Sequence, residues 1–219
     1  MSELVCLHAA GSGPDTWTTV APVLGALGHR VHCPPLLGHH AADRRPTYPL
    51  DAFRDAVLHD LDRRGLDRVT LVGHSLGAFV ATTVAAGAPD RVDRLVLEEM
   101  PVPPRDGADG PPSRRRIPAV AHALAGFLGR GRVDPAVVRE VVAELREPRP
   151  RWWEGLASVT APTLLLAGGP KSHLDQSRHD LVARAIPDAT VVRLDTGHRV
   201  HSTAPEAWLA ATTPFLATP

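Results

Sequence analysis

A short run of β-branched and apolar residues leads directly into a Gly-x-Ser-x-Gly motif, and this junction constrains the fold more than any other stretch. The run covers residues 68–72, the motif covers residues 73–77, and small residues follow as far as Gly87. The pattern predicts a buried strand, a very tight turn and a helix. Side chains two positions either side of the serine would clash in such a turn, which explains Gly73 and Gly77. Ser75 is therefore expected at the end of a strand, with its Oγ accessible and the amide of Leu76 beside it.

Other apolar runs of strand length alternate with stretches of helical spacing along the chain. Strands are expected at residues 3–7, 30–33, 93–97, 162–167 and 190–194. Helices are expected between them, including one that Asp51 caps and Gly65 ends, and one around Trp208. This alternation is typical of a parallel sheet with helices on both faces. A chain of 219 residues, 43% of them hydrophobic, can build one such core.

Composition changes at Pro101. From there to about residue 155 the chain is rich in Pro, Gly and Arg, with helical pieces at residues 119–128 and 134–145. Asp134 is expected to cap the second piece, with Pro135 at its first position. We interpret residues 101–155 as an inserted helical unit, and residues 1–100 and 156–219 as the core. Three arginines at 114–116 could bind phosphate, although a solvated start of a helix is the simpler interpretation.

Charge, hydropathy and cysteine content exclude several classes of protein. The chain has 24 Lys and Arg against 24 Asp and Glu, so no overall charge attracts nucleic acid or an acidic membrane surface. No apolar run has the length of a membrane span, and the first residues lack the layout of a signal peptide, so we expect a cytoplasmic protein. Cys6 and Cys33 make no disulfide framework and are expected as reduced thiols in or beside strands.

A serine hydroxyl needs an adjacent base to act as a nucleophile at neutral pH, and a third group must orient that base. His198 follows the last predicted strand and precedes the final helix. That position places it at the carboxyl ends of the strands, beside Ser75. His201 lies three residues further along the chain and remains an alternative base.

Over nearly its whole length the chain resembles the α/β-hydrolase superfamily. The matching pieces are His8 and Trp17 after the first strand, Gly38-His39 after the second, the motif around Ser75, the run 162–166, and Gly197-His198 with Pro205 beyond. The resemblance implies Ser75 as nucleophile and His198 as general base. It also implies an oxyanion hole formed by the backbone amides of Ala10 and Leu76. The family usually has a glycine where this chain has Ala9.

The acid of the implied triad is missing from its usual place. In the family it follows the strand that corresponds to residues 163–167, in a Gly-x-x-Asp pattern, but here Lys171 occupies that position. Glu99, at the end of the preceding strand, stands where some relatives have the acid, and we predict that it is the acid. Asp175, further along the loop, remains an alternative. Glu98 is a weaker candidate because strand alternation turns it to the opposite face from Glu99.

The chain also lacks the antiparallel hairpin with which relatives often begin. We therefore expect a mostly parallel sheet of about six strands, with residues 3–7 between the 30–33 strand and the strand before Ser75. The short 30–33 strand would then lie at the edge of the sheet. Since an exposed edge can pair with another chain, homodimerisation through this strand is a hypothesis.

The insert stands where the superfamily has a lid, which decides what reaches the nucleophile. Some of its apolar residues are expected to line a pocket: Ile117, Val120, Leu124, Phe127, Leu128, Val137, Val138, Val141 and Val142. An apolar pocket favours a small or medium hydrophobic ester, thioester or lactone, cleaved through an acyl-enzyme. No cofactor, metal, nucleic acid or membrane is implied. The alternatives are acyl transfer or perhydrolysis at the same site, and ligand binding without turnover, which the lysine at position 171 keeps open.

Overall fold

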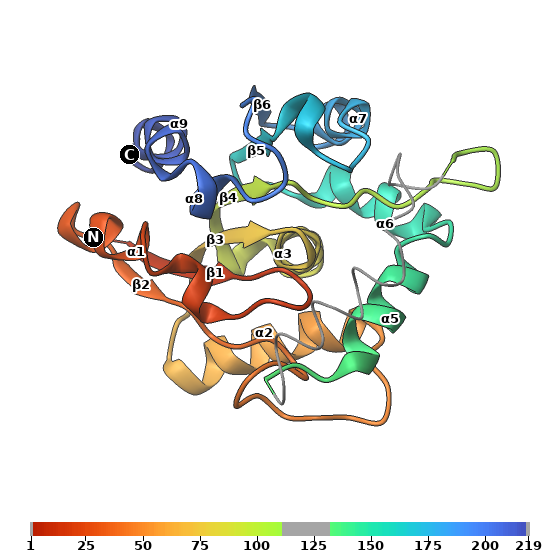
Figure 1. Ribbon diagram of the computed structural model, residues 1–219, viewed down its shortest axis with the longest axis horizontal. Coiled ribbons are helices and arrows are strands. Elements are labelled where there is room, and N and C mark those ends of the chain that lie inside the picture. The colour runs from red at the N-terminus through yellow and green to blue at the C-terminus, as the bar shows by residue number, and fades with distance from the viewer. Residues whose placement is uncertain (1, 111–131, 218–219) are drawn as a thin grey trace.

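Six strands form a single sheet in the order β2-β1-β3-β4-β5-β6, and each neighbouring pair is parallel. The computed structural model describes residues 2–110 and 132–217 (Figure 1). The strands are β1 Glu3–Leu7, β2 Arg30–His32, β3 Val69–His74, β4 Val92–Glu98, β5 Thr163–Ala167 and β6 Ala189–Arg193. The predicted sheet is confirmed, including the place of β1 between β2 and β3. The arginines at 114–116 and the helical piece at 119–128 lie outside the described residues.

Both faces of the sheet are covered by helices, and each face has its own hydrophobic cluster (Figure 1). Leu4 and Cys6 of β1 pack with α1 (Ala21–Ala26) and α9 (Pro205–Ala217). Val5 and Leu7 face the other way, toward α2 (Leu50–Arg64), α3 (Leu76–Gly87) and α7 (Ser177–Ala185). Alternate residues of one strand therefore serve both clusters, which is why the central strands read as continuous apolar runs.

The start of α2 differs from the sequence-based expectation. Pro49 is the N-cap of α2, so the prediction that Asp51 caps this helix is wrong. Asp51 lies in the first turn instead, where a carboxylate is stabilised by the helix dipole, and it is 3.7 Å from Arg54. The other end is as predicted, because Gly65 ends α2 in a left-handed conformation with φ of 65°. The remaining helices are η1 Pro14–Trp17, η2 Pro89–Arg91, α5 Pro135–Glu144, α6 Pro150–Gly155, η3 Leu156–Ser158, η4 Gly169–Lys171 and α8 Val200–Thr203.

The described part of the insert is anchored on the core. Asp134 caps α5 by accepting a hydrogen bond from the amide of Ala136 at 2.9 Å, with Pro135 in the first turn, as predicted. The amide of Asp134 donates to the carbonyl of Gly38 at 2.8 Å, and the hydroxyl of Tyr48 donates to its carboxylate at 2.9 Å. On the inner face of α5, Val137 and Val141 are buried with the main cluster. The long loop between β2 and α2 and the insert thus hold each other in place.

Both cysteines are free thiols. Within the described ranges, no helix combines the length and the apolar character that crossing a bilayer requires.

The turn between β3 and α3 depends on two glycines. A Cβ on Gly77 would lie 2.1 Å from the carbonyl oxygen of Leu7, and one on Gly73 would lie 2.5 Å from the α-carbon of Ala78. Both neighbours are backbone atoms of central elements, so neither can move without shifting a strand or a helix. The glycines therefore let α3 pack against the carboxyl end of β1, and this packing sets the position of Ser75.

Replacing Gly77 with alanine is expected to lower the free energy of unfolding by about 3 kcal/mol or more, because the added methyl group overlaps backbone. Gly25→Ala is the matched control, since a Cβ at this exposed position in α1 meets no atom of the described chain within 4 Å. That variant should be neutral or up to about 1 kcal/mol more stable. Urea unfolding of both proteins tests the prediction, and equal stability of the two variants would contradict it.

Candidate active site

Ser75 lies at the junction of β3 and α3, where the tight turn gives its backbone an unusual conformation. Its backbone has φ of 53° and ψ of −115°, a region that non-glycine residues rarely adopt. The amide of Ser75 donates to the carbonyl of Glu98 at 2.9 Å, which ties the turn to the end of β4. Ser75 is partly exposed, and Leu76 occupies the first position of α3, where a backbone N–H has no partner within the helix.

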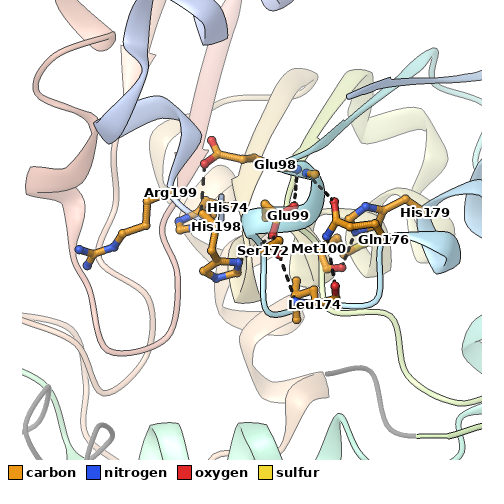
Figure 2. Close-up of polar contacts among 12 residues, drawn as sticks. His74, Glu98, Glu99, Met100, Ser172, Leu174, Gln176, His179, His198 and Arg199 are labelled. Carbon is orange, nitrogen blue, oxygen red and sulfur yellow. Dashed lines mark hydrogen bonds and ion pairs between the residues drawn. The ribbon is translucent and has the colours of Figure 1, made fainter. Parts of the chain in front are cut away.

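A buried carboxylate faces His198 at the same edge of the sheet. Glu99 directly follows β4, is fully buried, and has a left-handed backbone with φ of 49°. Its Oε2 lies 3.1 Å from Nδ1 of His198 and also accepts a hydrogen bond from the hydroxyl of Ser172. Its Oε1 accepts from the amide of Gly168 at 2.5 Å. Figure 2 shows Glu99 beside His198 and Ser172.

These donors keep Glu99 ionised. Burial alone would raise the pKa of its carboxyl, but the hydrogen bonds from His198, Ser172 and Gly168 outweigh burial and hold the pKa below its usual value. An ionised carboxylate accepts a hydrogen bond from Nδ1–H of His198, which leaves Nε2 as the nitrogen able to take a proton from a substrate or a nucleophile. The side chain of His198 is 22% exposed, against 0% for Glu99, so the imidazole is accessible while its partner is not.

The loop after β5 supplies two donors that the sequence did not reveal. Lys171, at the usual acid position, turns outward and contacts Asp195, with Nζ 3.0 Å from its carbonyl oxygen and 3.4 Å from Oδ2. The next residue, Ser172, turns inward to Glu99. Gly168 must be glycine, because a Cβ there would lie 2.0 Å from the carbonyl oxygen of Gly197. The only sequence signal for these roles is that both residues flank the position where the family has its acid.

The other candidates for the acid and the base have different partners. Asp175 accepts from the hydroxyl of Ser177 at 2.8 Å and lies 3.8 Å from Arg178. His201 is buried, and its Nδ1 lies 2.8 Å from Oε2 of Glu98. The structure therefore brings Glu99 together with His198, and Glu98 together with His201.

Two neutral histidines support the loop that carries Ala10. The amide of Leu36 donates to Nε2 of His8 at 3.1 Å, and the amide of Gly11 donates to Nε2 of His39 at 3.1 Å. A ring nitrogen that accepts an amide hydrogen bond carries no proton, so both imidazoles are neutral. Burial lowers the pKa of His8 to about 3 and also lowers the pKa of His39. Hydrogen bonds to the buried rings of His8 and His39 therefore fix the backbone around Ala10, while Ala10 itself stays partly exposed.

Two further aromatic residues surround the base region. His173, from the loop after β5, packs its ring edge-on against His198 with a centroid distance of 4.3 Å. Trp17 is fully buried and stacks on His201 with a centroid distance of 4.0 Å and an interplanar angle of 22°. Trp17 therefore contributes packing beneath the site, whereas partly exposed His173 borders it.

In the described part of the chain, one group of side chains has the spacing of metal ligands. His74, Glu98 and His201 offer ligand atoms within 4.8 Å of one another, and all three residues are buried. The atoms that face one another already have partners in the protein: Nδ1 of His201 bonds Glu98, and Nε2 of His74 bonds the carbonyl of His198 at 2.7 Å. Hydrogen bonds alone thus account for the arrangement.

Comparison with known proteins gives consistent results. The family model described as "Alpha/beta hydrolase family" matches residues 4–212. A pimeloyl-[acyl-carrier protein] methyl ester esterase of Aromatoleum aromaticum is 30% identical over 241 aligned positions, which cover 93% of this chain and 94% of that protein. The structure of a hydrolase from Pseudomonas aeruginosa PA01 superimposes with a TM-score of 0.71 at 25% identity, covering 99% and 90% of the two chains. The fold is also that of a meta-cleavage product hydrolase from Pseudomonas fluorescens IP01, with a TM-score of 0.75, 18% identity, and coverage of 99% and 90%.

The buried histidines predict how stability depends on pH. The pKa of His8 and of His74 is about 3 in the folded protein, chiefly through burial, against about 6.5 in an unfolded chain. Between these values the unfolded chain binds protons that the folded protein does not. The free energy of unfolding should therefore fall as the pH drops below 6.5, by up to about 1.4 kcal/mol per pH unit for each histidine.

Urea unfolding at pH 7.5, 6.0 and 5.0 measures this slope. His8→Gln should reduce it, whereas His59→Gln should not, because the side chain of His59 is exposed to water before and after unfolding. A stability that stays constant or increases from pH 7.5 to pH 5.0 would show that these histidines are not buried in the neutral form.

Proposed function

Since the chain belongs to the alpha/beta hydrolase family, we propose that it is a serine hydrolase whose triad is Ser75, His198 and Glu99. The observation that carries the proposal is the 3.1 Å contact between Nδ1 of His198 and buried Glu99, at the sheet edge where Ser75 directly follows β3. A base oriented by a carboxylate beside a serine in a strained turn is the arrangement that activates a hydroxyl.

In the proposed acylation step, Oγ of Ser75 attacks the carbonyl carbon of the substrate and its proton passes to Nε2 of His198. The positive charge on the imidazolium is stabilised by the ionised carboxylate of Glu99. The negative oxygen of the tetrahedral intermediate accepts hydrogen bonds from the amides of Ala10 and Leu76, each worth about 3–4 kcal/mol in the transition state. The intermediate then collapses: His198 returns the proton to the leaving alcohol or thiol, and an acyl-enzyme remains on Ser75.

Deacylation repeats these steps with water. His198 removes a proton from the water molecule as it attacks the acyl carbon, and the same two amides stabilise the second tetrahedral intermediate. Collapse of that intermediate releases the carboxylic acid and returns the proton to Oγ of Ser75. A lactone would follow the same course, except that its leaving alcohol stays attached to the acyl group until water releases both as one hydroxy acid.

For the substrate we propose a small or medium hydrophobic ester, thioester or lactone. The described part of the insert reaches the oxyanion loop, since a Cβ on Gly11 would lie 3.3 Å from Cγ2 of Val138 in α5. An apolar side chain at this contact favours an apolar acyl or alcohol group over a charged one. The esterase relative from Aromatoleum aromaticum, named for a methyl ester, supports ester chemistry.

Ligand binding without turnover loses its main support. A lysine at the usual acid position would oppose an imidazolium if its ammonium group faced the ring. Lys171 points to Asp195 at the surface, with 65% of its side chain exposed, while Glu99 takes the place beside His198. Acyl transfer at the same site would give a new ester when an alcohol acceptor is present, whereas hydrolysis gives the free carboxylic acid.

Hydrolysis of short p-nitrophenyl esters by wild type and Ser75→Ala tests the reaction. We expect kcat/KM to fall at least about 1000-fold in Ser75→Ala, because the residual site keeps only the oxyanion hole and substrate binding. Ser158→Ala, at an exposed serine in η3, should match wild type. Equal rates for wild type and Ser75→Ala would exclude a serine hydrolase.

Glu99→Gln and Asp175→Asn form a second matched pair, because each variant removes a charge and keeps the shape of the side chain. We expect Glu99→Gln to lower kcat by about 10³- to 10⁴-fold, since it cannot stabilise the imidazolium, and Asp175→Asn to change it less than about threefold. Steady-state kinetics with the same esters measures both. Full activity in Glu99→Gln together with a large loss in Asp175→Asn would reassign the acid to Asp175.

A further inference from the structure

Building on the proposed function, we propose that His74, Glu98 and His201 form a buried network that positions His198 relative to Ser75. None of the three is expected to touch the substrate. Each acts through the backbone, as a positioning residue, and each stands close in the chain to a member of the proposed triad. His74 precedes Ser75, Glu98 precedes Glu99, and His201 follows His198 by three residues.

The first connection runs from His74 to the backbone of His198. Nε2 of His74 lies 2.7 Å from the carbonyl oxygen of His198, and the ring centroids of the two histidines are 4.9 Å apart. A carbonyl oxygen only accepts, so Nε2 of His74 carries the proton and donates it. The residue next to the nucleophile is thus bonded to the main chain of the base.

The second connection holds the chain just beyond His198. Glu98 accepts two hydrogen bonds from His201, one from Nδ1 at 2.8 Å and one from the backbone amide at 3.3 Å. The loop that carries His198 is therefore held on both sides: His74 bonds its carbonyl, and Glu98 bonds the first turn of α8. Figure 2 shows Glu98 directed toward His74, away from Glu99.

Trp17 extends the network to the loop of the oxyanion hole. Its indole stacks on the ring of His201, and η1, which Trp17 ends, follows the loop that contains Ala10. Strand ends β3 and β4, the His198 loop and the segment after β1 thus meet in one buried cluster. These are the four segments that supply the nucleophile, the acid, the base and one oxyanion amide of the proposed mechanism.

The charges of the cluster suit a fixed role. Burial lowers the pKa of His74 to about 3, so this imidazole stays neutral and its Nε2 stays a donor throughout the neutral pH range. Burial alone would raise the pKa of Glu98, but the hydrogen bonds that it accepts from Nδ1 and the backbone amide of His201 help to lower it. Nδ1 of His74 and Nε2 of His201 have no partner among the described residues, so each ring makes its side-chain hydrogen bond through one nitrogen only.

Such a network matters because reaction rates depend steeply on geometry. A displacement of about 1 Å between reacting groups can cost about 100-fold in rate. Exposed loops at the ends of strands are the least constrained parts of a fold, and His198 lies on one of them. The network replaces this freedom with hydrogen bonds to two central strands.

The first test compares His74→Phe, which keeps an aromatic ring without the donor, with His74→Gln, whose amide N–H can occupy the place of Nε2–H. Active sites are counted by covalent labelling with a fluorophosphonate, and kcat is expressed per labelled serine. We expect His74→Phe to lower kcat about 10- to 100-fold with KM changed less than about threefold, and His74→Gln to recover most of the loss. A merely structural role would reduce the number of labelled sites and leave kcat per site unchanged.

The second test uses His201→Leu and His201→Asn in the same way, since the asparagine amide can replace Nδ1–H toward Glu98. His201→Asn should retain more of kcat per site than His201→Leu. The proposal is overturned if kcat per site in His74→Phe or His201→Leu equals that of wild type, or if the matched amide variants recover nothing. It is also overturned if neither His74→Phe nor His201→Leu folds, because the cluster would then be required for stability. Wild type that neither labels nor hydrolyses esters would instead refute the proposed function.

Discussion

The site depends on one buried carboxylate that is fully supplied with donors. Glu99 is inaccessible to water, and a carboxylate in such a place costs several kcal/mol unless its charge is compensated. Three donors from two loops provide that compensation: His198 from the loop after β6, and Gly168 and Ser172 from the loop after β5. Removing this carboxylate would take one hydrogen-bonding partner from each loop at the same time. The positive φ of Glu99 is tolerated for the same reason, since the surroundings fix the residue on every side.

Two adjacent glutamates at the end of β4, Glu98 and Glu99, each bind a different histidine. Glu98 is the last residue of β4, and Glu99 lies just beyond it with a left-handed backbone. Their side chains meet different histidines of one short segment, His201 and His198. In the pair of His198 and Glu99 the imidazole is partly exposed to water, whereas in the pair of His201 and Glu98 both side chains are buried. The pair of His198 and Glu99 is thus suited to proton transfer, and the pair of His201 and Glu98 to holding the backbone. The parallel sheet makes this possible, because all its strands end at the same edge.

Sequence patterns predicted the parts of this protein that depend on local or periodic constraints. The strand, Gly-x-Ser-x-Gly turn and helix follow from sterics within ten residues, and the alternation of apolar runs gave the parallel sheet and the place of β1. The cap of α2 was misplaced because Asp51 resembles a capping residue, whereas Pro49 holds that position. His198 was predicted as the partner of Glu99, but the other two donors, Gly168 and Ser172, were not. Ser172 is 73 residues away from Glu99 in the chain, and its neighbour Lys171 places a positive charge where the family has its acid. The bond from His74 to His198 spans 124 residues and leaves no local signal at all.

The central claim is that Ser75 is activated by His198 and Glu99, and the most direct measurement is the site and rate of reaction with a fluorophosphonate probe. Mass spectrometry of the modified peptide identifies the serine, and the second-order rate constant reports its activation. The account predicts that the probe labels Ser75 in wild type and reacts at least about 100-fold more slowly with Glu99→Gln than with Asp175→Asn. Labelling of another serine, or equal rates in the two variants, would contradict it.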